Sequence, residues 1–183
     1  MATVTEPITA DDLMRLPDNG DRLELVRGEV VRMPPPGFFH GVYVHRLSHW
    51  IQLFLDQHPL GWLIGEVGFR IAADPDTVRS PDIAFISQAR LDAAGGPTHG
   101  YLSCAPDLAI EVLSPNDSLP ETQAKAQEYL DAGSILVWIV NPRRRQVQVF
   151  RSHNPPRIHE ENDELDGDAV LPGFRCSVSA IFS

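Results

Sequence analysis

The sequence has few cysteines and few basic side chains, and these shortages exclude several classes of protein. Only Cys104 and Cys176 occur among the 183 residues, without a Cys-x-x-Cys pair, which argues against a disulfide framework and favours a reducing, cytoplasmic location. Fifteen Lys and Arg face 25 Asp and Glu, so the formal net charge is −10. A protein that coats nucleic acid or an anionic membrane by bulk attraction is therefore not expected. The longest strongly apolar run, residues 135–140, is too short to span a bilayer, and no membrane partner is expected.

What is present is typical of a globular chain. Apolar residues make up 43% and charged residues 22%, a balance that can bury a core. At this length one domain is expected over residues 1–183, with residues 1–20 as a peripheral lead-in and 21–182 as the core.

Hydrophobic periodicity predicts the helices and strands. A short helix follows Thr9, a hairpin joins residues 23–26 to 30–33 through Arg27-Gly28, and an amphipathic helix covers residues 40–57. Further strands are predicted at residues 62–71, 79–87, 108–113, 135–140 and 146–151, the last of them more exposed. A helix runs from Ser118 to Asp131 and ends before Gly133. Residues 92–101 form a loop, and a short hairpin precedes an apolar C-terminal tail. This order predicts an α/β (α+β) fold, a mixed sheet with helices packed against it.

One acidic residue stands out because of its surroundings. Glu111 lies in the apolar run 108–113, where a buried carboxylate is costly unless a proton or a cation compensates it. Asp82 opens another apolar strand directly after Pro81. Two such acids on adjacent strands could converge, and their repulsion would favour a divalent cation with oxygen ligands. Lys125 lies on the helix after the Glu111 strand and could reach back to orient water or stabilise phosphate charge.

The order of several short motifs along residues 9–182 resembles the Uma-two family of restriction endonucleases. The motifs are Glu24-Leu25-Val26-x-Gly28, His40 at a helix start, Pro81-Asp82, Glu111-Val112-Leu113-Ser114-Pro115, Lys125-x-x-x-Tyr129, Ala132-Gly133, Trp138 and Asn141-Pro142. The resemblance extends to the PD-(D/E)XK nuclease superfamily. It implies a restriction-endonuclease-like mixed sheet with an N-terminal hairpin and extra C-terminal strands, and a DNA substrate.

The resemblance also implies a metal-dependent active site. Asp82 and Glu111, with the backbone carbonyl of Val112, would hold Mg²⁺ or Mn²⁺ for hydrolysis of a phosphodiester. The superfamily's Lys two residues after the Glu is absent, because Leu113 stands there, and Lys125 would take its role from the helix.

Two further residues follow from the same resemblance. Glu24 would be the additional N-terminal acid, binding a second ion or ordering solvent. His40 would contact phosphate from the start of its helix.

Each candidate also has a purely structural interpretation. Asp82 could be a turn residue at a strand entry, and Glu111 could pair with Lys125 or an Arg without catalysis. Lys125 could be an exposed lysine paired with Glu121, and Glu24 a solvated strand residue.

Other motifs are weaker. His45 and His49 are four residues apart but lack a third zinc ligand, Ser114 lacks the elbow of a serine hydrolase, and the arginines 143–145 form a turn that is more often just solvated.

Three functions therefore stay open at this point. They are a metal-dependent endonuclease, a catalytically inactive nuclease-like module that binds DNA or protein, and a hydrolase of a smaller phosphoester. Pairing of residues 146–151 across a two-fold axis would give a homodimer.

Overall fold

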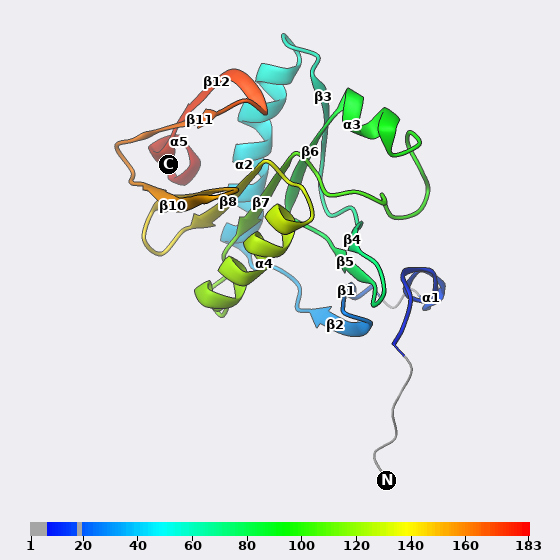
Figure 1. The fold of residues 1–183 in the computed structure, drawn as a ribbon. Helices are drawn as coiled ribbons and strands as arrows, with labels where there is room; N and C mark the ends of the chain where they lie inside the picture. Colours follow the sequence, from blue (N-terminus) through cyan, green and yellow to red (C-terminus); the bar gives the residue numbers. More distant parts are fainter. Residues whose placement is uncertain (1–6, 18–19) are drawn as a thin grey trace.

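The central sheet is organised around β7 (Leu108–Val112), whose five residues are all buried. The computed structural model describes residues 7–17 and 20–183 (Figure 1). Along the six-stranded central sheet the order is β10 (Asn154–His159), β9 (Gln146–Arg151), β8 (Leu136–Asn141), β7, β6 (Ile83–Ser87) and β3 (Gly61–Ile64). The pair β7 and β8 is parallel and every other neighbouring pair is antiparallel, which confirms the predicted mixed sheet.

Helices α2 (Phe38–Leu55) and α4 (Leu119–Asp131) cover opposite faces of the central sheet (Figure 1). Alternate residues of β7 divide between them, as expected for a strand covered on both sides. Ile110 packs in the apolar cluster that contains Leu47 of α2, whereas Ala109 packs in the cluster formed with α4. Helix α4 also makes the crossover from β7 to β8, because parallel strands cannot be joined by a tight turn.

A second sheet of four strands carries the N-terminal part of the chain. Its order is β2 (Glu29–Met33), β1 (Arg22–Val26), β5 (Thr77–Arg79) and β4 (Phe69–Ala72). The predicted hairpin forms β1 and β2, and its turn residues Arg27 and Gly28 have φ angles of 51° and 79°. Helix α1 (Ala10–Arg15) follows Thr9 as predicted, with Thr9 as its N-cap, and packs on this sheet. Of the predicted lead-in, residues 1–6 and 18–19 lie outside the described residues.

The C-terminal hairpin and tail also form as predicted. Strands β11 (Glu164–Gly167) and β12 (Leu171–Ser177) pair with each other, and α5 (Val178–Phe182) follows. Ile181 and Phe182 pack into the same apolar cluster as α2.

Two predicted strands are each divided in two by the structure. Residues 62–71 give β3 in the central sheet and β4 in the second sheet, because the chain bends at Glu66, which has a φ of 56°. Residues 79–87 give the end of β5 and all of β6, with Ser80-Pro81-Asp82 between them. Proline lacks the N–H that a continuous ladder needs, so the strand breaks there. The alternation of apolar and polar residues predicted strands correctly, but it does not show that the chain passes from one sheet to the other.

The hydrophobic pattern also failed to predict two elements, and it predicted the wrong exposure for a third. Helix α3 (Gln88–Ala93), capped by Ser87, was not predicted, and it includes the first two residues of the predicted loop 92–101. Strand β10 contains Pro155 and Pro156, and it is tolerated as an irregular edge strand. Strand β9 is buried rather than exposed, because β8 and β10 pair with both of its edges. The predicted two-fold pairing through residues 146–151 is therefore wrong.

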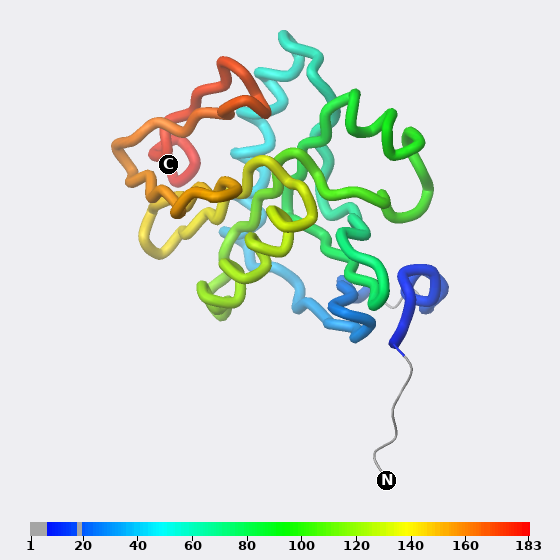
Figure 2. The backbone as a smooth tube through the Cα atoms, viewed as in Figure 1, coloured from blue at the N-terminus to red at the C-terminus, as the bar shows by residue number. Residues whose placement is uncertain are grey.

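The path of the chain brings distant segments to one end of the central sheet. Figure 2 shows the light blue connection from β2 to α2 near the green start of α4. Residues 34–37 of this connection line the same cleft as Ser118, Glu121 and Thr122. Within the part of the chain that is described, no helix combines the length and the apolar character needed to cross a membrane.

A glycine in β3 tests the close approach of β3 to β6. A Cβ on Gly61 would lie 2.1 Å from the carbonyl oxygen of Ile86, and backbone cannot move aside easily. We expect Gly61→Ala to lower the free energy of unfolding by about 1–3 kcal/mol. Urea denaturation measures this loss. Gly41→Ala in α2 is the control, since its Cβ meets nothing within 4 Å, and it should stabilise by about 1 kcal/mol. Equal effects of the two variants would contradict the packing described here.

Candidate active site

A cleft of about 590 Å³ opens where β6 begins and β7 ends. Antiparallel pairing brings these two strand ends together, and the start of α4 and the entry to α2 complete the walls. The structure brings all the predicted site residues to this cleft, which is lined by Glu24, His40, Asp82, Glu111, Val112 and Lys125 among others. Residues that are up to 101 positions apart in the sequence therefore share one cavity.

Lys125 is the link between two of the acids. Its Nζ lies 2.8 Å from Glu24 Oε1 and 2.8 Å from Glu111 Oε1, and only 11% of its side chain is exposed. The alternative of an exposed lysine paired with Glu121 is therefore wrong. One helical turn later, the hydroxyl of Tyr129 donates to the same Glu111 oxygen at 3.0 Å. Spacing of four residues on α4 thus presents two donors to one carboxylate.

Glu111 is the most strongly perturbed acid of the cleft. Burial raises its pKa to about 7, and the nearby charges of Asp82 and Glu24 act in the same direction, while Lys125 opposes them. Its two hydrogen-bond donors both contact Oε1, and among the described residues none donates to Oε2. A carboxylate in this state is stabilised by any further cation that reaches the cleft.

Glu24 is buried and held from three sides, so the alternative of a solvated strand residue is wrong. It is 2% exposed, and it accepts hydrogen bonds from Arg79 Nη1 at 2.8 Å and from the Ser80 backbone N–H at 2.9 Å. Burial alone would raise its pKa, but Lys125 and Arg79 outweigh burial and hold the pKa below the ordinary value. Arg79 also contacts Glu128 of α4 at 2.7 Å. The network therefore fastens β1 and β5 to α4.

Asp82 lies beside Glu111 on the neighbouring strand. Ile83 pairs with Ile110, so continuing the antiparallel register by one residue places Asp82 opposite Glu111. Opposed residues of an antiparallel pair point to the same face. The Val112 N–H donates to Asp82 Oδ2 at 2.8 Å, and His40 Nε2 lies 3.1 Å from the same oxygen. Burial alone would raise the pKa of Asp82, but these contacts outweigh burial and lower it.

His40 is turned toward Asp82 rather than toward open solvent. Burial would lower its pKa, but the hydrogen bond and the charge of Asp82 raise it. Its Nδ1 is buried and has no hydrogen-bond partner among the described residues.

The donor set suits a hard divalent cation. Carboxylate and carbonyl oxygens are the ligands that Mg²⁺ takes, and Asp82, Glu111 and the Val112 carbonyl are the oxygen donors expected here. Among the described residues, no group of three or more His, Cys, Asp or Glu side chains is arranged around a common point. Two side chains and one backbone carbonyl would leave the remaining positions to water, which is usual for Mg²⁺.

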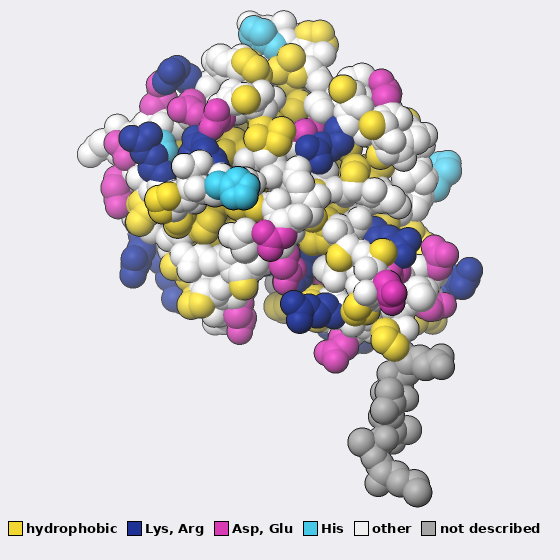
Figure 3. Space-filling view, viewed as in Figure 1, with side chains coloured by type: hydrophobic (Ala, Val, Ile, Leu, Met, Phe, Trp, Pro, Cys, Tyr) yellow, Lys and Arg dark blue, Asp and Glu magenta, His cyan; other side chains and the backbone are white. Residues whose placement is uncertain are grey.

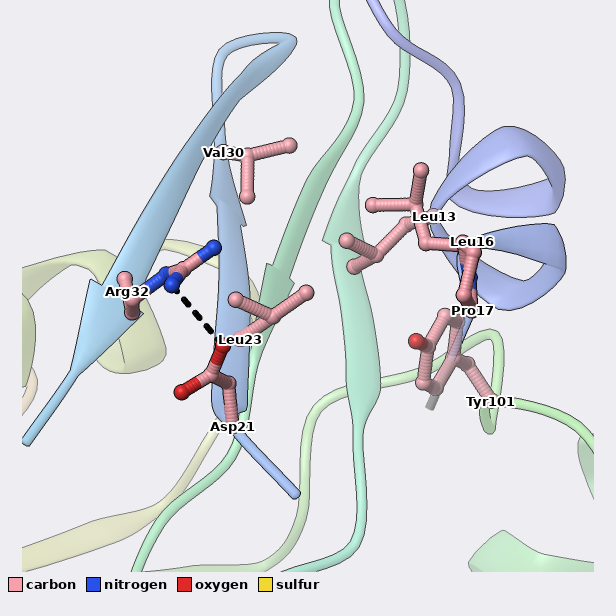
Figure 4. Close-up of a pocket in the computed structure, with 8 residues that line it drawn as sticks. All are labelled: Leu13, Leu16, Pro17, Asp21, Leu23, Val30, Arg32 and Tyr101. Atoms are coloured by element: carbon pink, nitrogen blue, oxygen red, sulfur yellow. Dashed lines mark ion pairs between the residues drawn. The ribbon is translucent and has the colours of Figure 1, made fainter. Parts of the chain in front are cut away.

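A second pocket lacks such a set. About 330 Å³ in volume, it lies between α1 and the β1–β2 hairpin (Figure 4). Its charged side chains, Asp21 and Arg32, pair with each other at 2.9 Å. The candidate catalytic and metal-binding residues therefore lie in the larger cleft.

The family follows from a comparison with known proteins. The model of Uma2, described as "Putative restriction endonuclease", matches residues 10–179. The chain belongs to the Uma2 family. This confirms the resemblance drawn from the motifs.

The fold of this Uma2 chain is similar to that of a crystal structure titled as a putative nuclease belonging to DUF820 from Anabaena variabilis. The two chains share 21% identity over 96% of this chain and 98% of the other, with a TM-score of 0.82. At this identity the likeness shows the fold, and it confirms the expected mixed-sheet architecture. No curated protein matches the chain.

Sequence reasoning assigned no role to three residues that contact the candidate site. Arg79 stands in β5 with two acidic partners, Tyr129 appeared only as part of a family motif, and Arg22 lies 3.5 Å from Asp82. The signal available for Arg79 was a charged residue two positions before Pro81-Asp82. Its partners, however, come from other elements, and no local pattern reveals them.

Removing Arg79 should destabilise the fold more than removing a surface arginine. Arg79→Met leaves Glu24 buried with fewer cations, so we expect a loss of about 3 kcal/mol in the free energy of unfolding. Arg32→Met, which breaks the exposed pair with Asp21, should cost less than about 1 kcal/mol. Chemical denaturation of both variants compares them directly, and equal losses would show that the buried network has no special weight.

The raised pKa of Glu111 predicts a pH-dependent stability. The pKa is about 7 in the folded protein and 4.5 ordinarily, so the folded state retains the proton between these values. Stability contributed by the protonated group is present below pH 4.5 and is lost as pH rises to 7, by up to about 3 kcal/mol. The measurement is the difference in unfolding free energy between wild type and Glu111→Gln, taken in the presence of EDTA. We expect this difference to fall by about 3 kcal/mol between pH 4.5 and 8. A difference that does not change with pH would contradict the raised pKa.

Proposed function

We propose that this Uma2 chain is a metal-dependent endonuclease that hydrolyses DNA phosphodiester bonds in the cytoplasm. The observation that carries the proposal is the grouping of Asp82, Glu111 and Lys125 in one cleft. Their arrangement agrees with the PD-(D/E)XK pattern, with the lysine supplied by α4 instead of position 113. Family membership and the nuclease-like fold support the same class of activity.

The charge of the cleft supports a need for cations. Its lining carries five carboxylates against three Lys and Arg, namely Glu24, Asp82, Glu111, Asp117 and Glu121 against Arg22, Arg79 and Lys125. A phosphodiester would be repelled by this excess of negative charge. Asp82, Glu111 and the Val112 carbonyl would hold Mg²⁺ or Mn²⁺, which when bound activates water and offsets charge on a phosphoryl oxygen.

The protein's own groups then have separate tasks. Lys125 has three N–H donors and two go to Glu24 and Glu111, so one donor is left for the attacking water or a phosphate oxygen. Glu24 holds the ammonium in place and could order solvent or a second ion. Tyr129 fixes one oxygen of Glu111, so that the other oxygen is presented to the cleft.

His40 would orient Asp82 through Nε2 and contact phosphate only if Nδ1 became accessible. Its Nε2 is already engaged at 3.1 Å, which makes the positioning of Asp82 its first role. Asp82 is thereby kept ionised by a neighbour as well as by the Val112 N–H.

A homodimer would suit cleavage of both strands. The free edges of the central sheet are β10 and β3, so a pairing through the sheet would use one of these and not β9. Sedimentation velocity at several concentrations decides between monomer and dimer.

The nuclease proposal predicts a defined loss of activity. Purified protein with Mg²⁺ or Mn²⁺ should nick supercoiled plasmid, and EDTA should abolish nicking. Asp82→Asn, Glu111→Gln and Lys125→Met should each lower the rate by about 10²-fold or more, as loss of a metal ligand or of a charge-stabilising group does. Agarose gels report the rate of conversion to open circles.

A surface acid supplies the matched control. Glu164→Gln changes an exposed glutamate that pairs with Arg175 outside the cleft, and its nicking rate should equal that of wild type. Equal rates for wild type and the three cleft variants would assign the activity to a contaminant. Folded protein without any cleavage would instead favour the inactive binding module.

A further inference from the structure

The two most exposed aromatic side chains of the described chain stand next to the cleft. Phe38 is 80% and Phe39 is 67% exposed, whereas other exposed large apolar residues reach at most 54%. Both residues belong to the first turn of α2, between Gly37 and His40, which line the cleft. Their rings contact each other edge to face at 5.4 Å, and Phe39 stacks on Tyr43. These two exposed rings, called the aromatic platform below, therefore stand on α2 between two residues that line the proposed active site.

Two arginines without a carboxylate partner lie near another border of the same cleft. Ten of the fifteen Lys and Arg side chains form ion pairs with carboxylates. Within residues 7–17 and 20–183, the basic side chains without a carboxylate partner are Arg27, Arg46, Arg143, Arg144 and Arg157. Arg143 donates to the carbonyl of Pro115, which lines the cleft, and Arg144 is its exposed neighbour.

The surface charge disfavours strong binding of a DNA duplex. A duplex presents one phosphate charge about every 1.7 Å of its axis, and its binding rests on many Lys and Arg contacts. Charges of both signs are interspersed over the face shown in Figure 3, and the net charge is −10. A single strand needs fewer such contacts, because its bases can stack on aromatic rings.

From these two borders we propose that the cleft takes an unpaired DNA strand. Phe38 and Phe39 stack on one or two of its bases, and Arg143 and Arg144 contact its phosphates. The inference rests on the proposed nuclease function and adds the class of substrate. In this scheme the aromatic platform binds unpaired bases and no other partner.

Binding of labelled oligonucleotides tests the scheme. The Glu111→Gln background with Mg²⁺ is used to limit cleavage, and fluorescence anisotropy compares an oligo-dT strand with a duplex of equal length. We expect the single strand to bind more tightly, and Phe38→Ala/Phe39→Ala to weaken it about tenfold or more. Trp50→Ala, a 42% exposed aromatic further along α2, is the matched control and should leave binding unchanged.

Salt dependence tests the arginines separately. Removing two phosphate contacts should lower the slope of log Kd against log salt by about 1.4, because each contact on a single strand contributes about 0.7. We expect this change for Arg143→Ala/Arg144→Ala and none for Arg157→Ala. An unchanged slope for the double variant would remove the arginines from the proposal.

The outcomes separate this inference from the proposed function. Tighter binding of duplex, or full single-strand binding by the phenylalanine variant, would overturn the inference while plasmid nicking by wild type still supported the nuclease. Absence of nicking with intact single-strand binding would overturn the nuclease and leave a binding module. A change of sedimentation coefficient in the phenylalanine variant would assign the platform to self-association, which also overturns the inference.

Discussion

The cleft depends on one buried ammonium group shared by two carboxylates. Lys125 contacts Glu24 and Glu111 at the same distance of 2.8 Å, and without it two acids would be buried side by side. Even with it, the pKa of Glu111 is raised to about 7. Lys125 thus keeps the two acids together, but it does not fully offset the burial of Glu111. That residual deficit of positive charge is what makes the cleft receptive to a further cation.

The route of the chain explains how a helix can supply this lysine. A residue two positions after Glu111 points to the same face of the strand, so a lysine at position 113 would also have faced the cleft. Leu113 instead packs in the apolar cluster with Leu119 and the rest of α4. Because α4 is the crossover between the parallel strands β7 and β8, it must return over this same face. Position 125 lies in its middle, and the long lysine stem spans the remaining gap.

Much of this arrangement could be predicted from the sequence, and the reasons differ from element to element. Strand β7 and helix α4 carry strong periodic signals, so their place and type were predicted, and Glu111 stood out because its neighbours are all apolar. Glu24 gave no such signal, since its burial depends on Arg79 and Lys125, which arrive from two other elements. The division of residues 62–71 between two sheets was equally hidden, because alternation defines a strand but not its partners. Strand β10 contradicts local preference at two prolines, and only its edge position makes that acceptable.

The acidity of the chain has a consequence for how such a site would choose its substrate. An enzyme with net charge −10 gains little from long-range attraction to DNA, so its encounter with a random duplex is weak. Affinity must then come from contacts made at the cleft itself, and under the proposed function these would include a bound cation and the surfaces at the borders of the cleft. Under the proposed function, loss of the cation from Asp82 and Glu111 at low metal concentration would make binding and chemistry decline together. An acidic surface around an acidic cleft would therefore restrict the proposed cleavage to DNA that offers short-range contacts, which is a form of selectivity that does not require a separate recognition domain.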